Sequence, residues 1–157
     1  MAASARAGAH LARWLRHRGA LTELVAQLPE GAAGFRPWSE AMTTAALIQH
    51  IALATDRFFG AVRDGALPPP PAVRPAPPAT IAEARALLEE KTAEDRRILE
   101  GLADARLDAR LAFGPMGDVP GDALLTLAID HEIHHKGQLW TYARMCGVAP
   151  PSFVRRE

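Results

Sequence analysis

Apolar side chains recur every three to four positions along most of the chain, the spacing of one face of an α-helix. Alternating runs rich in valine, isoleucine and threonine, which are typical of strands, are nearly absent. The pattern predicts four long helices, and we expect them at residues 4–28, 39–62, 80–105 and 120–146. The fold class that follows is all-α.

Residues that start and stop helices stand at the ends of these segments. Ser39 fits the N-cap of the second helix, and Thr80 with Glu83 fits a capping box at the start of the third. Pro120 suits the first turn of the fourth helix, and Gly147 suits the position just beyond its end. These signals agree with the boundaries that the apolar spacing indicates.

The segment between the second and third helices, LPPPPAVRPAPPA, is too rich in proline to be helical. Such a segment forms an extended connection that can run the full length of a bundle. We therefore predict a four-helix bundle with one long Pro-rich crossover between the second and third helices. Because no internal repeat and no second domain stand out, we expect residues 1–157 to form a single domain.

Composition is that of a globular chain without a strong overall charge. Hydrophobic residues make up 48% of the 157 residues, and 18 basic residues balance 18 acidic ones. This balance favours neither nucleic acid nor a membrane as a partner, and no apolar run is long enough for a transmembrane span. Cys146 is the single cysteine, which excludes an intrachain disulfide and favours the reducing cytoplasm.

Three histidines crowd the stretch HEIHHKGQLW at residues 131–140. On a helix, His131 and His135 stand one turn apart, on a stripe shared with apolar residues. Burying two imidazoles together is costly unless something binds them, so a metal site and a hydrogen-bonded core pair both stay open. His50, a lone imidazole in the apolar stripe of the second helix, is the best candidate for a third ligand.

The same stretch opens with the H-E-x-x-H pattern of zinc proteases, in which Glu132 would be the base. That pattern usually finds its third ligand downstream, but the only carboxylate side chain after His135 is that of Glu157. Such enzymes also hold a peptide on an edge strand, and the sequence predicts no strand. The protease interpretation is therefore disfavoured. Asp130 and Glu132 flank the candidate ligands, and either could accept a hydrogen bond from a ligand imidazole, but we expect both to be exposed carboxylates.

Three further residues are candidates for the pocket around the metal. Gln138, one turn beyond His135, either hydrogen-bonds a water on the metal or simply faces a polar pocket. Tyr142 either lines the same pocket or fills the core. Arg57, two turns after His50, either meets an anionic substrate or is solvated. No catalytic residue is assigned among them.

The remaining histidines and the cysteine are expected outside the ligand set. His10 and His17 lie on an arginine-rich helix, and we expect both on the solvated surface. His134 stands at the edge of the apolar stripe rather than on it. Cys146, at the end of the fourth helix, is too far along to reach the metal.

The motif DHEIHHKGQLWTYARMCGVAPPSF strongly resembles the C-terminal motif of the DinB/YfiT-like family of metalloenzymes. LIQHIALATDRFF resembles the family's second-helix motif and LPEGAAGFRPW its first loop, so the resemblance covers about residues 10–153. It implies a four-helix bundle, often dimeric, with a divalent metal held by three histidines. Carried over residue by residue, these are His50, His131 and His135.

Some members of this family resemble thiol-dependent transferases or isomerases that use bacillithiol, mycothiol or glutathione. The resemblance therefore implies a metal-dependent enzyme that acts on a small molecule, with the metal holding a thiol co-substrate as its thiolate. Two alternatives stay open: a metal-dependent hydrolase that activates water, and a non-catalytic metal-binding stress-response protein. Imidazole ligands suit zinc, nickel, iron and manganese, so the sequence leaves the metal open.

A second apolar stripe, formed by Ile129, Ile133 and Trp140, lies on the opposite side of the fourth helix. A helix with two apolar faces is either enclosed by its own bundle or buried between subunits. We expect a homodimer.

Overall fold

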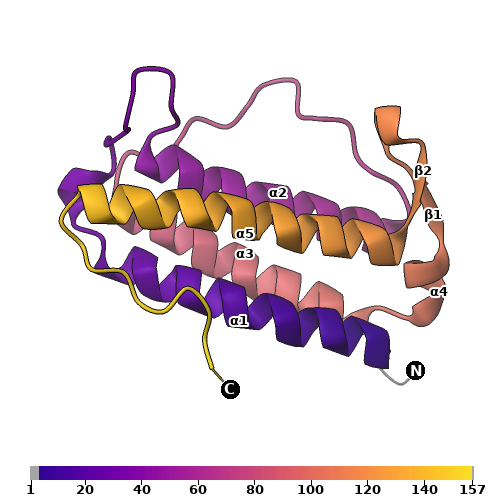
Figure 1. Ribbon diagram of the computed structural model, residues 1–157. Coiled ribbons are helices and arrows are strands. Elements are labelled where there is room, and N and C mark those ends of the chain that lie inside the picture. The colour runs from indigo at the N-terminus through magenta and orange to yellow at the C-terminus, as the bar shows by residue number, and fades with distance from the viewer. Residues whose placement is uncertain (1–3, 157) are drawn as a thin grey trace.

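The computed structural model describes residues 4–156 and consists mainly of helices (Figure 1). Four long helices form a bundle: α1 (Ala5–Gln27), α2 (Thr44–Asp64), α3 (Ile81–Gly101) and α5 (Gly121–Met145). Two single 3₁₀ turns lie in the connections: η1 (Glu30–Ala32) and η2 (Gly114–Met116). The predicted fold class, an all-α four-helix bundle, is confirmed.

The order of the helices in space explains the long crossover. α2 packs against α3 and α5, and α1 packs against the same two helices. In Figure 1 α2 and α3 run in the same direction, because the crossover between them returns along the length of α2. A short loop would make consecutive helices antiparallel instead. The Pro-rich segment therefore has the bridging role that its composition predicts.

The start of α2 differs from the prediction. Its N-cap is Thr43 rather than Ser39, and the Thr43 hydroxyl accepts a hydrogen bond from the amide of Ala46 at 3.2 Å. The residues before Thr43 form a loop, which the carbonyl of Phe35 closes by accepting the amide of Thr44 at 2.8 Å. Ser39 is typical of a cap by residue type, but this loop holds it outside the helix.

Three other predicted helix ends agree closely with the structure. The Thr80 hydroxyl accepts the amide of Glu83 at 3.0 Å, and the Glu83 carboxylate accepts the amide of Ala79 at 2.8 Å, as in a capping box. Gly147 follows α5 with φ of 79°, a left-handed conformation that glycine adopts without strain. Pro120 is the N-cap residue of α5, just before its first turn.

The connection between α3 and α5 is more structured than predicted. α3 ends at Gly101 instead of residue 105, and a short helix, α4 (Asp104–Asp108), follows it. The strands β1 (Arg110–Ala112) and β2 (Asp118–Pro120) then pair antiparallel, so the expectation of no strand is wrong here. Strands this short show no recognisable alternation. Three buried leucines secure this end of the bundle: Leu102, Leu107 and Leu111.

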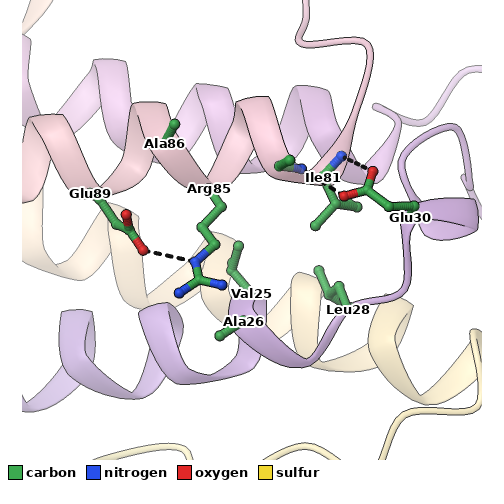
Figure 2. A pocket seen from close by; sticks show the side chains of 9 residues that line it. Val25, Ala26, Leu28, Glu30, Ile81, Arg85, Ala86 and Glu89 are labelled. Carbon is green, nitrogen blue, oxygen red and sulfur yellow. Dashed lines mark hydrogen bonds and ion pairs between the residues drawn. The ribbon is translucent and has the colours of Figure 1, made fainter.

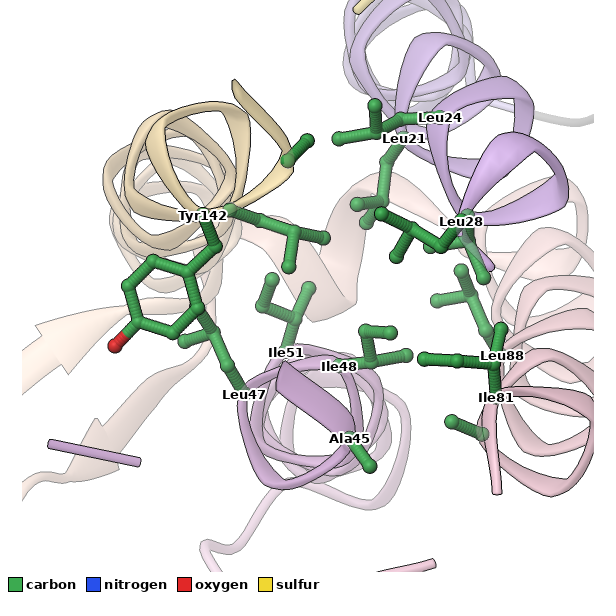
Figure 3. Close-up of a cluster of buried hydrophobic side chains, with 14 of the residues drawn as sticks. Leu21, Leu24, Leu28, Ala45, Leu47, Ile48, Ile51, Ile81, Leu88 and Tyr142 are labelled. Carbon is green, nitrogen blue, oxygen red and sulfur yellow. The ribbon is translucent and has the colours of Figure 1, made fainter. Parts of the chain in front are cut away.

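Leucine, isoleucine and alanine side chains from all four long helices fill the bundle. Figure 3 shows part of this core, with Leu21, Ile48 and Leu88 from α1, α2 and α3 turned towards one another. Ile129 and Trp140, from the stripe proposed as a subunit interface, are 0% and 6% exposed within this one chain. The chain's own bundle therefore accounts for the burial of that stripe.

Residues 147–156 fold back from the end of α5 towards α1 (Figure 1). The amide of Arg155 donates to the carbonyl of Arg16 at 3.0 Å, and the ammonium of Lys136 donates to the carbonyl of Phe153. Within residues 4–156, no helix combines the length and the apolarity needed to cross a bilayer.

Candidate metal centre

Three histidines converge at one point between α2 and α5. His131 and His135 lie one turn apart on α5, and His50 lies on the neighbouring α2. The Nε2 atom of His50 is 3.2 Å from Nε2 of His131 and 3.1 Å from Nε2 of His135. One ring nitrogen from each residue lies within 4.8 Å of the other two. The structure thus brings together the three residues that the sequence predicted as a set.

The spacing of these nitrogens suits one shared ion. Imidazole nitrogens bind zinc at about 2.0–2.1 Å, so two of them at a tetrahedral angle stand about 3.3–3.4 Å apart. The distances from His50, 3.1 and 3.2 Å, are close to that separation. A hydrogen bond would satisfy only one of these two contacts, because a neutral ring carries a single N–H. The three histidines therefore form a group that can hold a divalent transition metal.

Gln138 orients one of these rings. Its side-chain oxygen lies 2.7 Å from Nδ1 of His135. Because that oxygen can only accept, the proton sits on Nδ1 and the lone pair of Nε2 is left for a metal. Gln138 thus contacts a candidate ligand itself, a role not among those considered from the sequence. Nδ1 of His131 is buried and has no hydrogen-bond partner within the described chain.

The surroundings keep two of the imidazoles neutral. Burial, followed by the charges of His135 and His50, lowers the pKa of His131 from 6.5 to about 4. Burial also lowers the pKa of His50, and the charges of His135 and Arg74 add to the effect. Neutral imidazole is the form that binds metals, so both rings are ready to bind near pH 7.

Aromatic side chains border the centre on one side. Phe58 of α2 lies edge-on to His131, with ring centroids 6.2 Å apart, and Phe113 lies 5.8 Å from Phe58. Both phenylalanines are partly buried against the core and give the centre an apolar border. Phe58, two turns after His50 on α2, had a helical spacing that could have indicated this role. Phe113 lies in a loop, where spacing carries no such signal.

Glu132 is fully buried, which contradicts the expectation of an exposed carboxylate. It accepts two hydrogen bonds from Arg18, at 2.8 and 2.7 Å, and one each from Trp14 and Thr55 at 2.9 Å. Burial alone would raise the pKa of Glu132, but the charge and hydrogen bonds of Arg18 hold it below its ordinary value. Its oxygens join α5 to α1 and α2 and are not free to act as a catalytic base. Asp130 is exposed, as predicted.

The other histidines are more enclosed than predicted. His10 and His17 are half-buried rather than solvated. His10 pairs with Asp122 at 3.0 Å, and His17 accepts a hydrogen bond from Lys136 at 2.9 Å. Both pairs join α1 to α5, and a partner on another helix cannot be recognised from local spacing. His134 is exposed, with its ring beside that of His135.

Tyr142 and Arg57, both pocket candidates, contact other parts of the fold. Tyr142 is buried, donates its hydroxyl proton to the carbonyl of Met42 at 3.2 Å, and packs edge-on to Phe35. Arg57 donates to the carbonyl of Pro68 at 2.7 Å. Tyr142 therefore fills the core, and Arg57 ties the crossover to α2.

A surface hollow of about 260 Å³ lies between α1 and α3, and none of the three histidines lines it (Figure 2). Its charged groups already have partners: Arg85 pairs with Glu89 at 2.8 Å. The carboxylate of Glu30 accepts the amides of Ile81 and Ala82, both at 3.0 Å. Glu30 thus satisfies free amides at the start of α3, and these groups serve the helix rather than a ligand.

Comparison with known proteins gives one family match and one close relative. A family model described as the DinB superfamily matches residues 13–139. The uncharacterized protein YjoA of Bacillus subtilis (strain 168) is 30% identical over 151 residues. That alignment covers 94% of this chain and 95% of the relative.

Solved structures of other proteins share the fold, among them two DinB-like proteins. The crystal structure of a DinB-like protein, YjoA, from Bacillus subtilis superposes with a TM-score of 0.80 and 26% identity, over 94% of this chain and 99% of the other. That of a DinB-like protein from Bacillus cereus ATCC 10987 superposes with a TM-score of 0.79 over 97% of this chain and 99% of the other. At 17% identity, the second match shows the fold alone.

Proposed function

This chain belongs to the DinB superfamily, and from that premise we propose that it is a metal-dependent enzyme. It would transfer or isomerise a small molecule with the help of a low-molecular-weight thiol. His50, His131 and His135 would hold one divalent transition metal, with zinc, nickel, iron and manganese all compatible with imidazole ligands. The observation that carries the proposal is the convergence of three imidazole nitrogens within 4.8 Å.

Bound at this centre, the ion would supply positive charge that favours a thiol in its nucleophilic thiolate form. Protein side chains would support this chemistry in two ways. Gln138 would hold the ring of His135 in place, and Phe58 and Phe113 would limit the access of solvent on one side of the ion.

The nearby carboxylates are paired with arginines, and this favours a thiol over water as the nucleophile. Hydrolysis usually uses a protein group to take a proton from water. Glu132 accepts hydrogen bonds from Arg18 in the core, and Asp130 forms an ion pair with Arg13 at 2.7 Å. Neither carboxylate is therefore well placed to take a proton from water. A thiol has a lower pKa than water, so beside the same ion it loses its proton more readily without such help. A metal-dependent hydrolase remains the second candidate, and a non-catalytic metal-binding protein the third.

The metal-binding part of the proposal is tested by metal analysis of protein purified without chelators. We expect about one ion per chain, since three ligands from one chain suffice for one site. His131→Ala removes one of three ligands and should lower the metal content sharply. Full metal content in that variant would contradict the site.

The thiol part is tested by incubating the metal-loaded protein with thiols and alkylating electrophiles. The panel contains bacillithiol, mycothiol, glutathione and cysteine. Thiol consumption that stops when the metal is removed supports a transferase or isomerase. Metal-dependent cleavage of esters or amides without thiol supports the hydrolase, and neither activity supports the binding protein.

The quaternary structure and the location of the protein are also proposals. The family resemblance supports a homodimer, although Ile129 and Trp140 are buried within the single chain. Light scattering after size-exclusion chromatography distinguishes about twice the chain mass of 16.9 kDa from the chain mass itself. A single cysteine, Cys146, supports the cytoplasm.

A further inference from the structure

The Pro-rich crossover is attached to the helix that carries His50. Near its end, the side-chain amide of Gln49 donates to the carbonyl of Ala76 at 2.8 Å. Near its beginning, Arg57 donates to the carbonyl of Pro68 at 2.7 Å. Figure 1 shows the crossover arching along α2 between its two ends. The crossover is therefore held beside the helix that supplies a metal ligand.

Arg74 lies in this crossover close to the attachment at Gln49. It precedes Ala76 by two residues, and an extended proline-rich chain rises about 3.1 Å per residue, which places its backbone within about 6 Å of Ala76. Gln49, the partner of Ala76, directly precedes His50 in α2. Pro75 follows Arg74 and restricts the backbone there. One hydrogen bond and a stiff chain thus hold the backbone of Arg74 near the turn of α2 that carries His50.

The charge of Arg74 is not used elsewhere in the fold. Across residues 4–156, the side chain of Arg74 makes no ion pair or hydrogen bond, and it is exposed. By contrast, Arg57 and Arg63, both on α2, are held by Pro68 and Asp64. An arginine that is exposed, unpaired and held near the turn that carries His50 is available to a bound molecule.

The centre itself is short of negative charge. Its three candidate ligands are imidazoles, so a divalent ion there keeps its full positive charge. The carboxylate of Glu132 is offset by Arg18, and that of Asp130 by Arg13. An anionic ligand would therefore be attracted both by the ion and by the positive charge of Arg74 on the crossover.

We infer that Arg74 is the anion-binding residue of the three-histidine centre, and that the molecule bound there carries a carboxylate. The inference rests on the proposed metal site. The planar guanidinium pairs with a carboxylate through two parallel hydrogen bonds, so it can select an acidic thiol over a neutral one. Because the crossover is stiff and attached at both ends, little chain freedom is lost when Arg74 binds.

Calorimetric titration of zinc-loaded protein with two thiols tests the inference. The probes are mercaptosuccinate, which carries two carboxylates, and thioglycerol, which is uncharged and of similar size. Wild-type protein should prefer mercaptosuccinate, and Arg74→Gln should weaken its binding about 10-fold while leaving thioglycerol within about 2-fold. Arg74→Lys should restore part of the loss, because a point charge replaces the planar pair.

The control is Arg144→Gln, which removes the same charge from an exposed site near the end of α5 and should change neither affinity. Zinc content, measured first, separates the two proposals. Wild-type protein that takes up no zinc overturns the metal site and, with it, the role of Arg74. Zinc-loaded Arg74→Gln that binds mercaptosuccinate as wild type does, or that weakens both thiols equally, overturns the role of Arg74 alone.

Discussion

At the residue scale, the centre depends on which nitrogen of each imidazole carries the proton. His135 is fixed by Gln138, whose side-chain oxygen lies 2.7 Å from Nδ1 and can only accept a hydrogen bond. Such outer partners hold the ring in the orientation that presents its other nitrogen to the metal. The position of Gln138, one turn beyond its partner on the same helix, makes this a local device of α5.

Replacing Gln138 with alanine should therefore weaken metal binding without removing a ligand. Loss of an outer partner of this kind typically lowers metal affinity about 10- to 100-fold. Competition with a chromophoric chelator measures this affinity directly. Gln27→Ala, at the exposed end of α1, is the control and should bind metal as wild type does. Equal affinities in all three proteins would show that His135 needs no orienting partner.

The sequence was informative about which histidines converge and misleading about the glutamate between two of them. His131 and His135 could be paired because the helical period converts a spacing of four into a shared face. Glu132 was predicted to be exposed because its burial depends on Arg18, Trp14 and Thr55, which lie on two other helices. No local sequence pattern indicates hydrogen bonds between different helices, because each of these residues is ordinary within its own helix.

At the element scale, the long helices were predictable because each presents an apolar face over many turns. The exact ends of these helices were harder to predict from the sequence. Thr43 and Ser39 are both good cap residues, and the loop that decides between them is closed by Phe35 and Thr44. The short helix and the two strands after Gly101 were not predicted, for a related reason. They are held by burial against the end of the bundle rather than by their own periodicity.

The choice of cap can be measured by two matched substitutions. Thr43→Ala removes the hydroxyl that accepts the amide of Ala46, so the free energy of unfolding should fall by about 1 kcal/mol. Ser39→Ala should leave it within about 0.5 kcal/mol, because an exposed loop residue holds no helix end. Urea denaturation followed by circular dichroism gives both values. A larger loss for Ser39→Ala would place the start of α2 where the sequence first indicated.

At the scale of the whole molecule, the described chain buries two basic side chains, Arg18 and Lys136, and two acidic ones, Asp95 and Glu132. Arg18 is paired with Glu132, while Asp95 of α3 lies 3.7 Å from Arg18 and has no hydrogen-bond partner within the described chain. Burial, offset in part by Arg18, raises the pKa of Asp95 to about 8. The group formed by Arg18, Glu132 and Asp95 is therefore neutral near pH 7, with one ion pair and one protonated carboxyl.

This balance predicts a pH dependence of stability that Asp95→Asn should remove. In the unfolded chain the carboxyl has its ordinary pKa of 3.8, so between pH 3.8 and about 8 the folded state binds an extra proton. The contribution of Asp95 to stability then falls as pH rises through this window, by at most about 1.4 kcal/mol per pH unit. Asparagine does not ionise and avoids this loss.

Urea denaturation at pH 5 and pH 8 measures the effect. The free energy of unfolding of Asp95→Asn should improve relative to wild type between pH 5 and pH 8. If the variant is instead destabilised equally at both pH values, Asp95 is ionised in the fold and acts as a partner of Arg18.

The central claim is that α2 and α5 together hold one divalent ion, and the metal content of His50→Ala tests it most directly. His50 is the one proposed ligand outside the HEIHHKGQLW motif, so its role depends on the packing of two helices. Wild-type protein and the control His134→Ala, which changes an exposed histidine of the motif, should each hold about one ion per chain. His50→Ala should hold nearly none under the same dialysis. Full metal content in His50→Ala, or equal loss in His134→Ala, would contradict a centre shared between the two helices.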